Sequence, residues 1–270
     1  MPADVSVIIP TFRRRAELRE ALQSVLSQDG TQLEVIVVDD SPERSAYDVV
    51  TEIADRRIRY EPNPCPSGGW VSAVRNHGAA LATGALVHFL DDDDQAPPGH
   101  YAAMTAAFEA NPHVGVIFGR VEPFGDNPKA LEHERLVFDS AARRAAASRR
   151  FGSKWAFSSR LFFSNSLLVC GAAMIRRSCA EAVGGFDTRL RVAEDVDFYA
   201  RAIRQFGAHF IDRVTLRYRI WNASLMHTPA LEPTLVRDCY RKIHARYRSE
   251  RGALDYFATK ILTRTLLRLV

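Results

Sequence analysis

The sequence predicts an α/β protein with a mostly parallel central sheet and helices on both faces of that sheet. Three observations predict this fold class. Short apolar runs of strand length alternate with helical patterns through the first 120 residues, as in parallel sheets. The chain has 270 residues, 47% of them hydrophobic, which is enough for one large core. No internal repeat or low-complexity linker divides the chain.

The first half of the chain contains four predicted strands and four predicted helices. Each strand is a short run rich in Val, Ile or Leu, and each helix has apolar residues three or four positions apart. Proline and glycine residues between 62 and 69 mark a loop before the third helix. In chain order, we expect strands at 5–9, 33–38, 58–60 and 85–90, and helices at 14–28, 45–54, 70–82 and from about 98.

The second half has weaker periodicity. Residues 123–160 carry paired arginines and an alanine cluster, and we interpret them as a variable excursion. Regular structure is expected again over 167–175 and in a helix over 194–206. Two short strands, 209–211 and 214–220, then close the fold, and a helical tail begins at Pro233.

Composition excludes several classes of protein. A formal charge of +4 is too small to indicate a nucleic-acid-binding protein. The four cysteines form no C-x-x-C pair, so neither a disulfide framework nor a zinc site is predicted. No apolar run approaches 18 residues, and no secretory signal precedes the first strand. The expected location is therefore cytoplasmic.

Acidic residues follow two of the predicted strands. Asp39 and Asp40 end the second strand, and Asp91 to Asp94 follow the fourth. In open α/β sheets, ligands bind beyond the carboxyl ends of the strands. Adjacent carboxylates repel each other, and a hard divalent cation such as Mg²⁺ or Mn²⁺ relieves that repulsion. In extended geometry Asp91 and Asp93 point the same way. The alternative is a solvated acidic turn that caps the next helix.

Five segments in order resemble the family 2 glycosyltransferases of the GT-A fold. The resemblance runs from about residue 5 to about residue 220. It is carried by Val5-Ser-Val-Ile-Ile-Pro-Thr-Phe12, Val-Val-Asp39-Asp40, Ser67-Gly-Gly with Ala73-Val-Arg75-Asn76, Phe89-Leu-Asp91-Asp-Asp93-Asp94, and Gly184-Gly-Phe-Asp187 with Glu194-Asp195-Val-Asp197.

The resemblance implies roles for the residues of these segments. Phe12 would lie against the nucleotide base, and Asp40 would accept a hydrogen bond from a pyrimidine N–H. Asp91 and Asp93 form a D-x-D element, which would hold a metal, Mn²⁺ or Mg²⁺, on the donor diphosphate. Arg75 is a nucleotide contact or a surface arginine. The residues assigned to the nucleotide sugar are Pro10, Thr11, Phe12, Asp40, Arg75, Asp91, Asp92, Asp93 and Gly185.

Asp195 resembles the general base of the family. Transfer with inversion needs a carboxylate that takes the acceptor proton on the face opposite the leaving group. Asp195 opens the predicted helix over 194–206 and follows a glycine-rich turn. The alternative role for Asp195 is N-capping of that helix.

The sequence departs from the family where many relatives carry a histidine that helps to bind the metal or the diphosphate. Trp221 stands at this place, and His227, a few residues later, is the candidate substitute. The Q-x-x-R-W element and membrane helices of processive synthases are absent, so one sugar per encounter is expected. Arg13-Arg14-Arg15 is interpreted as a solvated start of a helix.

The tail is basic and amphipathic. Val236, Tyr240, Ile243 and Tyr247 share one face of its first helix. Lys260, Arg264 and Arg268 recur every four residues, opposite Phe257, Ile261, Leu262, Leu266 and Leu269. Such a helix docks on the core of its own domain or on a partner subunit, as in a homodimer, or it lies on an anionic membrane. A location at the inner face of a membrane would follow from the last alternative.

These observations predict a metal-dependent, inverting glycosyltransferase that uses a UDP- or dTDP-linked sugar. The acceptor is a hydroxyl compound, and a saccharide, a lipid-linked saccharide and a small natural product all remain open. Two alternatives stand beside it: a nucleotidyltransferase on a related scaffold, and a non-catalytic protein that binds sugar nucleotides. The expected organisation is a domain over 1–230, with a nucleotide-binding half (1–120) and an acceptor half (121–230), followed by a helical extension (231–270).

Overall fold

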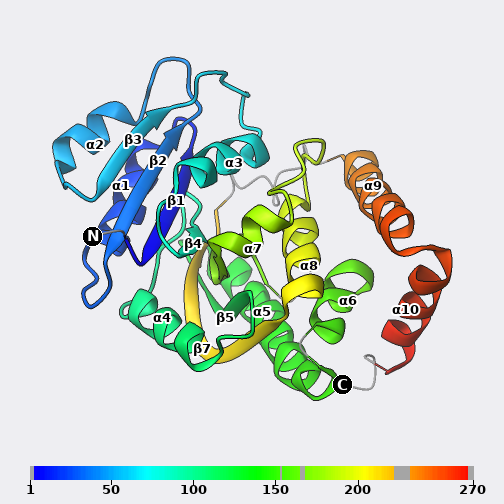
Figure 1. Cartoon of the computed structure of the whole chain (residues 1–270). Helices are drawn as coiled ribbons and strands as arrows, with labels where there is room; N and C mark the ends of the chain where they lie inside the picture. The colour runs from blue at the N-terminus through cyan, green and yellow to red at the C-terminus, as the bar shows by residue number, and fades with distance from the viewer. Residues whose placement is uncertain (1–2, 153, 165–167, 222–231, 267–270) are drawn as a thin grey trace.

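The structure is a computed structural model in which residues 3–152, 154–164, 168–221 and 232–266 are described. Strands and helices alternate through most of this part of the chain (Figure 1). The strands are β1 (Val5–Thr11), β2 (Leu33–Asp39), β3 (Ile58–Pro62), β4 (Leu86–Phe89), β5 (Val116–Phe124), β6 (Ala173–Arg176) and β7 (Ala208–Arg219). The helices are α1 (Arg15–Leu26), α2 (Tyr47–Ile53), α3 (Val71–Leu81), α4 (His100–Ala110), α5 (Pro128–Ser148), α6 (Trp155–Phe163), α7 (Arg177–Ala182), α8 (Glu194–Phe206), α9 (Pro233–Arg251) and α10 (Ala253–Leu266), with short 3₁₀ turns at Arg149–Phe151 and Cys170–Ala172.

The described strands form one seven-stranded sheet in the order β3-β2-β1-β4-β6-β5-β7. The pairs β2–β3, β1–β2, β1–β4 and β5–β7 are parallel, and β6 is antiparallel to both of its neighbours. The predicted α/β class with a mostly parallel sheet is therefore confirmed. The carboxyl ends of β1, β2 and β4 lie at one edge of this sheet, because the three strands are parallel neighbours.

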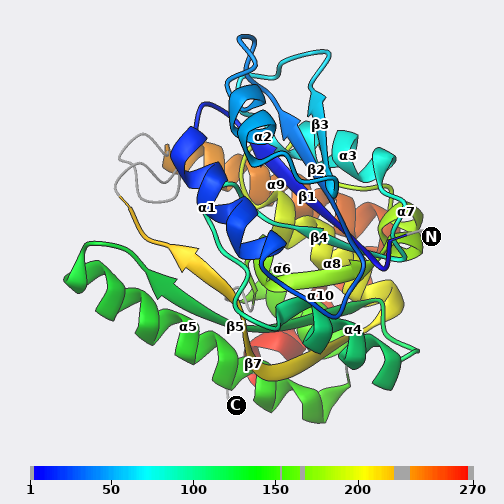
Figure 2. The same ribbon diagram turned by 90° about the vertical axis from the view of Figure 1, so that its left-hand side faces the viewer.

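Helices cover both faces of the sheet. Successive apolar side chains of β1 point to opposite faces, so each face needs a covering layer. Ile8 packs in one core cluster with the buried residues of α3, α6 and α8, whereas Val7 and Ile9 pack in a second cluster with those of α1 and α4. Figure 2 shows α1 and α4 on the side of the sheet that faces the viewer. β1 continues through Pro10, beyond the predicted end. The pairing of β1 with β4 stops at Ile8. Pro10 has no backbone N–H to donate, and at its position β4 no longer offers a carbonyl that would need one.

Two expectations for the second half are wrong. The excursion expected over 123–160 is regular structure, namely the end of β5, the 21-residue helix α5 and the helix α6. Helix α5 lies on the surface and buries only Ala145 and Ser148. It therefore lacks the wide apolar stripe from which a helix is predicted in a sequence. The two short strands expected after residue 208 are one strand, β7, with a shift in register opposite Gly119.

Of the alternatives predicted for the tail, docking on the domain holds for α9. Ile243 and Tyr247 of α9 are buried in the core cluster that covers α6 and α8, so this helix docks on the domain. Helix α10 instead buries Tyr256, Thr259 and Thr263, and leaves Leu254, Phe257, Ile261 and Leu262 exposed. None of the described helices is long and apolar enough to cross a membrane.

Candidate active site

The acidic segment after β4 is a turn, closed by a hydrogen bond from the Asp94 N–H to the Asp91 carbonyl (3.1 Å). The expected extended geometry is therefore wrong. Exposure nevertheless alternates along the turn: Asp92 and Asp94 are buried, whereas Asp91 and Asp93 are partly open to solvent. The two carboxylates of the D-x-D element are thus the accessible ones.

The end of β7 holds this acidic turn in place. Arg219 donates from its backbone N–H to Asp94 Oδ1 and from Nε to the Asp93 carbonyl, both over 2.9 Å. Trp221 donates from Nε1 to Asp93 Oδ2 over 3.1 Å. Trp221, which stands where many relatives carry histidine, therefore supplies an N–H donor and no metal ligand. His227 lies outside the described residues.

Arg14 reaches the acidic turn from the start of α1. Its Nη1 lies 3.0 Å from Asp92 Oδ1 and 2.7 Å from Asp93 Oδ2. Its guanidinium also lies over the ring of Trp221, 5.0 Å from the centroid. The interpretation of the arginine triplet as a solvated helix start fits Arg13 and Arg15, which are exposed, and is wrong for Arg14.

Arg75 joins the acidic turn to the start of α8. Its Nη2 lies 2.6 Å from Asp91 Oδ1, and its Nη1 lies 2.8 Å from Glu194 Oε1. The side chain is only 3% exposed and lies over the ring of Phe186, 5.3 Å from the centroid. The surface-arginine interpretation is therefore wrong. Because both terminal nitrogens are engaged, Arg75 acts as a bridge between the two acidic segments, and its contact with a nucleotide stays a prediction.

The glycine-rich turn before α8 is held by the residue next to Arg75. Asn76 donates from Nδ2 to the Phe186 carbonyl, and the Phe186 N–H donates to Asn76 Oδ1, each over 2.8 Å. Gly185 has φ +71°, and a Cβ there would come within 2.6 Å of Asn76 Oδ1. Only glycine allows this backbone conformation and this close approach together. A part for Gly185 in binding the sugar stays a prediction.

Asp195 lies in the first turn of α8, one residue after Glu194. The residue before the helix, Ala193, has left-handed φ +58° and makes no side-chain cap. Asp195 accepts a hydrogen bond from the Val196 N–H over 2.7 Å, so it does not occupy the N-cap position of the alternative interpretation. Burial, followed by the negative charge of Glu194, raises the pKa of Asp195 to about 7, and Arg75 opposes this rise. A carboxyl group with such a pKa can take up a proton near neutral pH.

Asp40 is buried at the end of β2 and anchors the loop that precedes α3. Its Oδ1 accepts from Asn63 Nδ2 (2.6 Å) and the Ser67 N–H (2.8 Å), and its Oδ2 accepts from Ser67 Oγ and the Gly69 N–H (both 2.8 Å). These four donors use the lone pairs of the carboxylate. A pyrimidine N–H would therefore have to displace part of this loop to reach Asp40.

The end of β1 lies beside Asp40, because Thr11 pairs in register with Asp39. Pro10 and Thr11 are buried, and Phe12 is half-buried with the Arg13 guanidinium over its ring at 4.9 Å. The predicted residues from β1, β2 and β4 therefore share one edge of the sheet, and Arg75 connects that edge with α8. The roles of these residues in binding stay predictions.

The charges around the acidic turn favour an added cation. Burial raises the pKa of Asp92 to about 7, against the effect of Arg14. Burial also raises the pKa of Asp93; Arg14 opposes this, and the charge of Asp91 adds to it. Both shifts mean that negative charge here is incompletely compensated.

The carboxylates fit a metal that takes its other ligands from elsewhere. In the contacts among the described residues, Asp91 uses Oδ1 and Asp93 uses Oδ2, which leaves Asp91 Oδ2 and Asp93 Oδ1 as hard oxygen ligands. The described part of the chain contains no group of three or more His, Cys, Asp or Glu side chains that could hold a metal. Mg²⁺ and Mn²⁺ fit such a pair, because they retain positions for water and phosphate oxygens.

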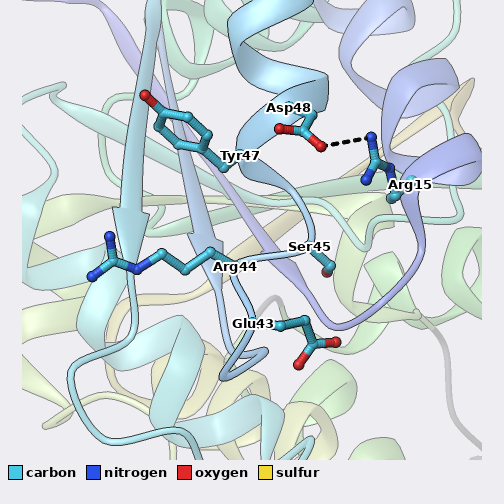
Figure 3. A pocket seen from close by; sticks show the side chains of 6 residues that line it. All are labelled: Arg15, Glu43, Arg44, Ser45, Tyr47 and Asp48. Carbon is cyan, nitrogen blue, oxygen red and sulfur yellow. Dashed lines mark ion pairs between the residues drawn. The ribbon is translucent and has the colours of Figure 1, made fainter.

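A surface hollow of about 380 Å³ lies near the sheet edge but outside this site. Figure 3 shows the side chains that line it, with an ion pair of 3.0 Å between Arg15 and Asp48. None of the acidic-turn residues lines the hollow. It is therefore a neighbouring surface feature and not the candidate site.

Four contributors were missed in the sequence: Arg14, Asn76, Glu194 and Trp221 as partners of the predicted residues. Asn76 and Glu194 lie within quoted motifs, and Arg14 follows one by two residues, so proximity to the motifs was the available signal for these three. Trp221 stands where many relatives carry a histidine, and that position was its signal. The sequence offered no sign that Arg14 and Trp221, more than 200 residues apart, meet at one carboxylate.

Sequence comparison relates the chain to enzymes that transfer sugars. The family model described as "Glycosyl transferase family 2" matches residues 6–184. The chain is similar to the GalNAc(5)-diNAcBac-PP-undecaprenol beta-1,3-glucosyltransferase of Campylobacter jejuni subsp. jejuni serotype O:2, with 36% identity over 140 residues. The matched region covers 50% of this chain and 44% of that relative, so the chain spans less than half of its length.

Solved structures share the fold. S. aureus TarS 1–349 in complex with UDP-GlcNAc has a TM-score of 0.65 and 19% identity, over 92% of this chain and 67% of that one. The mannosyltransferase PcManGT from Pyrobaculum calidifontis, in complex with GDP-Man and Mn²⁺, has a TM-score of 0.58 and 18% identity, over 100% of this chain and 81% of that one. At these identities the likeness concerns the fold alone.

Proposed function

This chain belongs to glycosyl transferase family 2 and has the GT-A fold, and we propose that it moves one sugar at a time, with inversion, from a UDP- or dTDP-linked donor to a hydroxyl acceptor. Its assignment as a glycosyltransferase leaves the nucleotidyltransferase alternative without support. The observation that carries the proposal is the bridge from Asp91 through Arg75 to Glu194, beside Asp195. This bridge joins the donor-side acids to the proposed base.

The donor binds at the edge formed by β1, β2 and β4. Phe12 lies against the base. Asp40 accepts a hydrogen bond from the ring N–H of the base after part of the loop over 63–69 has moved away from its carboxylate. Pro10, Thr11, Arg75, Asp92 and Gly185 complete the contacts with the nucleotide sugar. Support comes from the neighbour TarS, which binds UDP-GlcNAc on the same fold.

Asp91 and Asp93 would hold Mn²⁺ or Mg²⁺, as the neighbour PcManGT with GDP-Man and Mn²⁺ suggests for this fold. Such an ion supplies Lewis-acid neutralisation of the leaving diphosphate. Arg14 and Trp221 orient Asp93 through Oδ2 and leave Oδ1 turned to other ligands. A third protein ligand from His227 remains part of the proposal.

Asp195 takes the acceptor proton, and its raised pKa suits that task at neutral pH. The acceptor half of the domain, 121–230, and the extension over 231–270 would bind the acceptor, opposite the nucleotide half over 1–120. The name of the Campylobacter relative supports a lipid-linked saccharide as one acceptor class, beside free saccharides and small natural products.

A thermal-shift screen of nucleotide sugars tests the donor and the metal together. We expect a UDP- or dTDP-linked sugar to raise the melting temperature in the presence of Mn²⁺, because a ligand that binds only the folded state stabilises it. Asp93→Ala should lose this dependence on Mn²⁺. Equal UDP affinity with and without Mn²⁺ in the unaltered protein would reject the metal assignment, and hydrolysis or transfer measured with the best donor decides whether the protein is catalytic.

A further inference from the structure

Helix α10 exposes four large apolar side chains and buries two threonines beside Tyr256. Leu254, Phe257, Ile261 and Leu262 are 89%, 51%, 61% and 43% exposed. These four residues, called here the outer face of α10, are spaced three, four and one positions apart and therefore form one stripe. Figure 1 shows α10 at the margin of the molecule that lies farthest from α1 and α2.

The opposite face of α10 contains two buried threonines. Thr259 and Thr263 are 4% and 2% exposed, and Thr263 Oγ1 donates to the Thr259 carbonyl over 2.7 Å. This face packs on α6 and α9. A helix that had only to cover the domain would place Leu, Ile and Phe inward, because their burial is what stabilises a docked helix. The inverted pattern indicates that the outer face has an apolar partner of its own.

Positive charge surrounds the outer face. Arg264 is exposed at its edge, and Arg248 and Arg251 are exposed at the adjoining end of α9. The acid within α10, Asp255, accepts from Arg204 Nη2 (2.8 Å) and Tyr247 Oη (2.9 Å), so the domain itself compensates that charge. Glu250 is exposed at the same end of α9, and its Oε1 lies 3.9 Å from Arg246 Nε. The surface beside the stripe therefore carries a net positive charge.

We propose that the outer face of α10 docks on an anionic lipid bilayer. Leu, Ile and Phe side chains would enter the boundary between headgroups and acyl chains, and Arg251 and Arg264 would lie at the headgroup phosphates. A second copy of this chain is the poorer occupant, because a symmetric contact would bring the same arginines together. The charge of the surface complements an anionic bilayer.

The tail can hold the domain on such a surface because α9 is fixed to the catalytic half. Arg246 of α9 pairs with Asp187 of the glycine-rich turn (2.7 Å), and Lys242 Nζ donates to the Arg189 carbonyl (3.1 Å). Docking of α10 would therefore orient the whole domain relative to the bilayer.

Flotation of the unaltered protein with lipid vesicles tests the proposal without any activity measurement. We expect binding to phosphatidylcholine vesicles that contain phosphatidylglycerol, little binding to pure phosphatidylcholine, and weaker binding at high salt. The double variant Phe257→Gln/Ile261→Gln should lose at least about tenfold in vesicle affinity, because it replaces two of the four apolar side chains that would insert. Arg251→Gln/Arg264→Gln should lose affinity for the anionic vesicles alone.

The matched control is Leu136→Gln/Val137→Gln, which removes two exposed apolar side chains from α5. It should bind vesicles like the unaltered protein, and all variants should keep the same melting temperature and the same shift with donor. The proposal is overturned if the unaltered protein does not float with anionic vesicles, or if the α10 variant floats equally well. It is also overturned if light scattering finds a dimer that the α10 substitutions dissociate, because a second copy then covers the face.

Discussion

Asp195 and its neighbours illustrate how single residues set the chemistry of the site. Two adjacent acids open α8, but they have different partners: Glu194 pairs with the buried Arg75, whereas Asp195 accepts a hydrogen bond from the Val196 N–H and makes no ion pair within the described residues. The charge of Glu194 helps to raise the pKa of Asp195. The arrangement therefore ties Glu194 to Arg75 and leaves Asp195 able to exchange a proton near neutral pH.

The rate of transfer should depend on the protonation of Asp195. A base must be deprotonated to act, and because its pKa is raised to about 7, kcat/KM should rise as pH increases towards 7 and level off above it. Asp195→Asn should lower kcat by about 10²-fold or more, with donor affinity unchanged. The check is a pH–rate profile of both proteins with a nucleotide-binding control. Comparable turnover in the variant would dismiss Asp195 as the base.

Arg75 is expected to be more important for folding than an exposed arginine. Arg75→Met would leave Asp91 and Glu194 without their shared cation, and breaking a buried ion pair from one side costs about 3–5 kcal/mol. Arg15→Met, which breaks an exposed pair with Asp48 (3.0 Å), should cost less than about 1 kcal/mol. Urea unfolding of both variants measures the difference. Equal losses would mean that the bridge contributes little.

At the scale of elements, the strands and helices that position the site were largely predictable. Runs such as 33–38 and the helix over 194–206 have clear periodicity, and both are confirmed. Surface helix α5 and the bulged strand β7 were not predictable. A helix that buries few residues has no strong apolar stripe. A β-bulge interrupts the alternation of a strand and resembles a turn in the sequence. The contacts of Arg14 and Trp221 depend on tertiary packing, which no local pattern encodes.

The turn that precedes α8 provides a matched pair of glycine substitutions. Gly184 and Gly185 have similar φ values, +75° and +71°, but a Cβ at Gly184 would meet nothing within 4 Å, whereas one at Gly185 would meet Asn76. Gly184→Ala should therefore cost only the backbone strain, about 1–2 kcal/mol. Gly185→Ala should cost about 1–3 kcal/mol more, because it disturbs the two hydrogen bonds between Asn76 and Phe186. Denaturant unfolding of the two variants measures the two losses of stability. Equal losses would contradict the importance of the close approach between Gly185 and Asn76.

At the scale of the whole molecule, α9 ties the tail to α8 and to the glycine-rich turn before α8 through charge as well as packing. Arg246 pairs with Asp187 and with the fully buried Asp197, which also receives Arg201 Nε over 2.9 Å. Burial opposes the charge of such carboxylates, and the arginines compensate it; the pKa of Asp187 is lowered to about 2, chiefly by its hydrogen bond from Arg189. The tail is thus part of the electrostatic structure of the domain, although the sequence pattern alone marked it as an extension.

Removal of this tie should loosen the tail and weaken the fold together. Arg246→Met would leave Asp187 and Asp197 with one cationic partner fewer each, so we expect a loss of about 3–5 kcal/mol and faster proteolysis after residue 232. Arg241→Met is the control from the same helix. Within the described part of the chain, Arg241 pairs with the exposed side chain of Asp238 alone (2.9 Å), so its loss should cost less than about 1 kcal/mol. If Arg246→Met unfolded at the same urea concentration as the control, packing of Ile243 and Tyr247 would suffice to hold α9. If the midpoint of urea unfolding fell but the rate of proteolysis after residue 232 did not change, Arg246 would stabilise α8 and not the attachment of the tail.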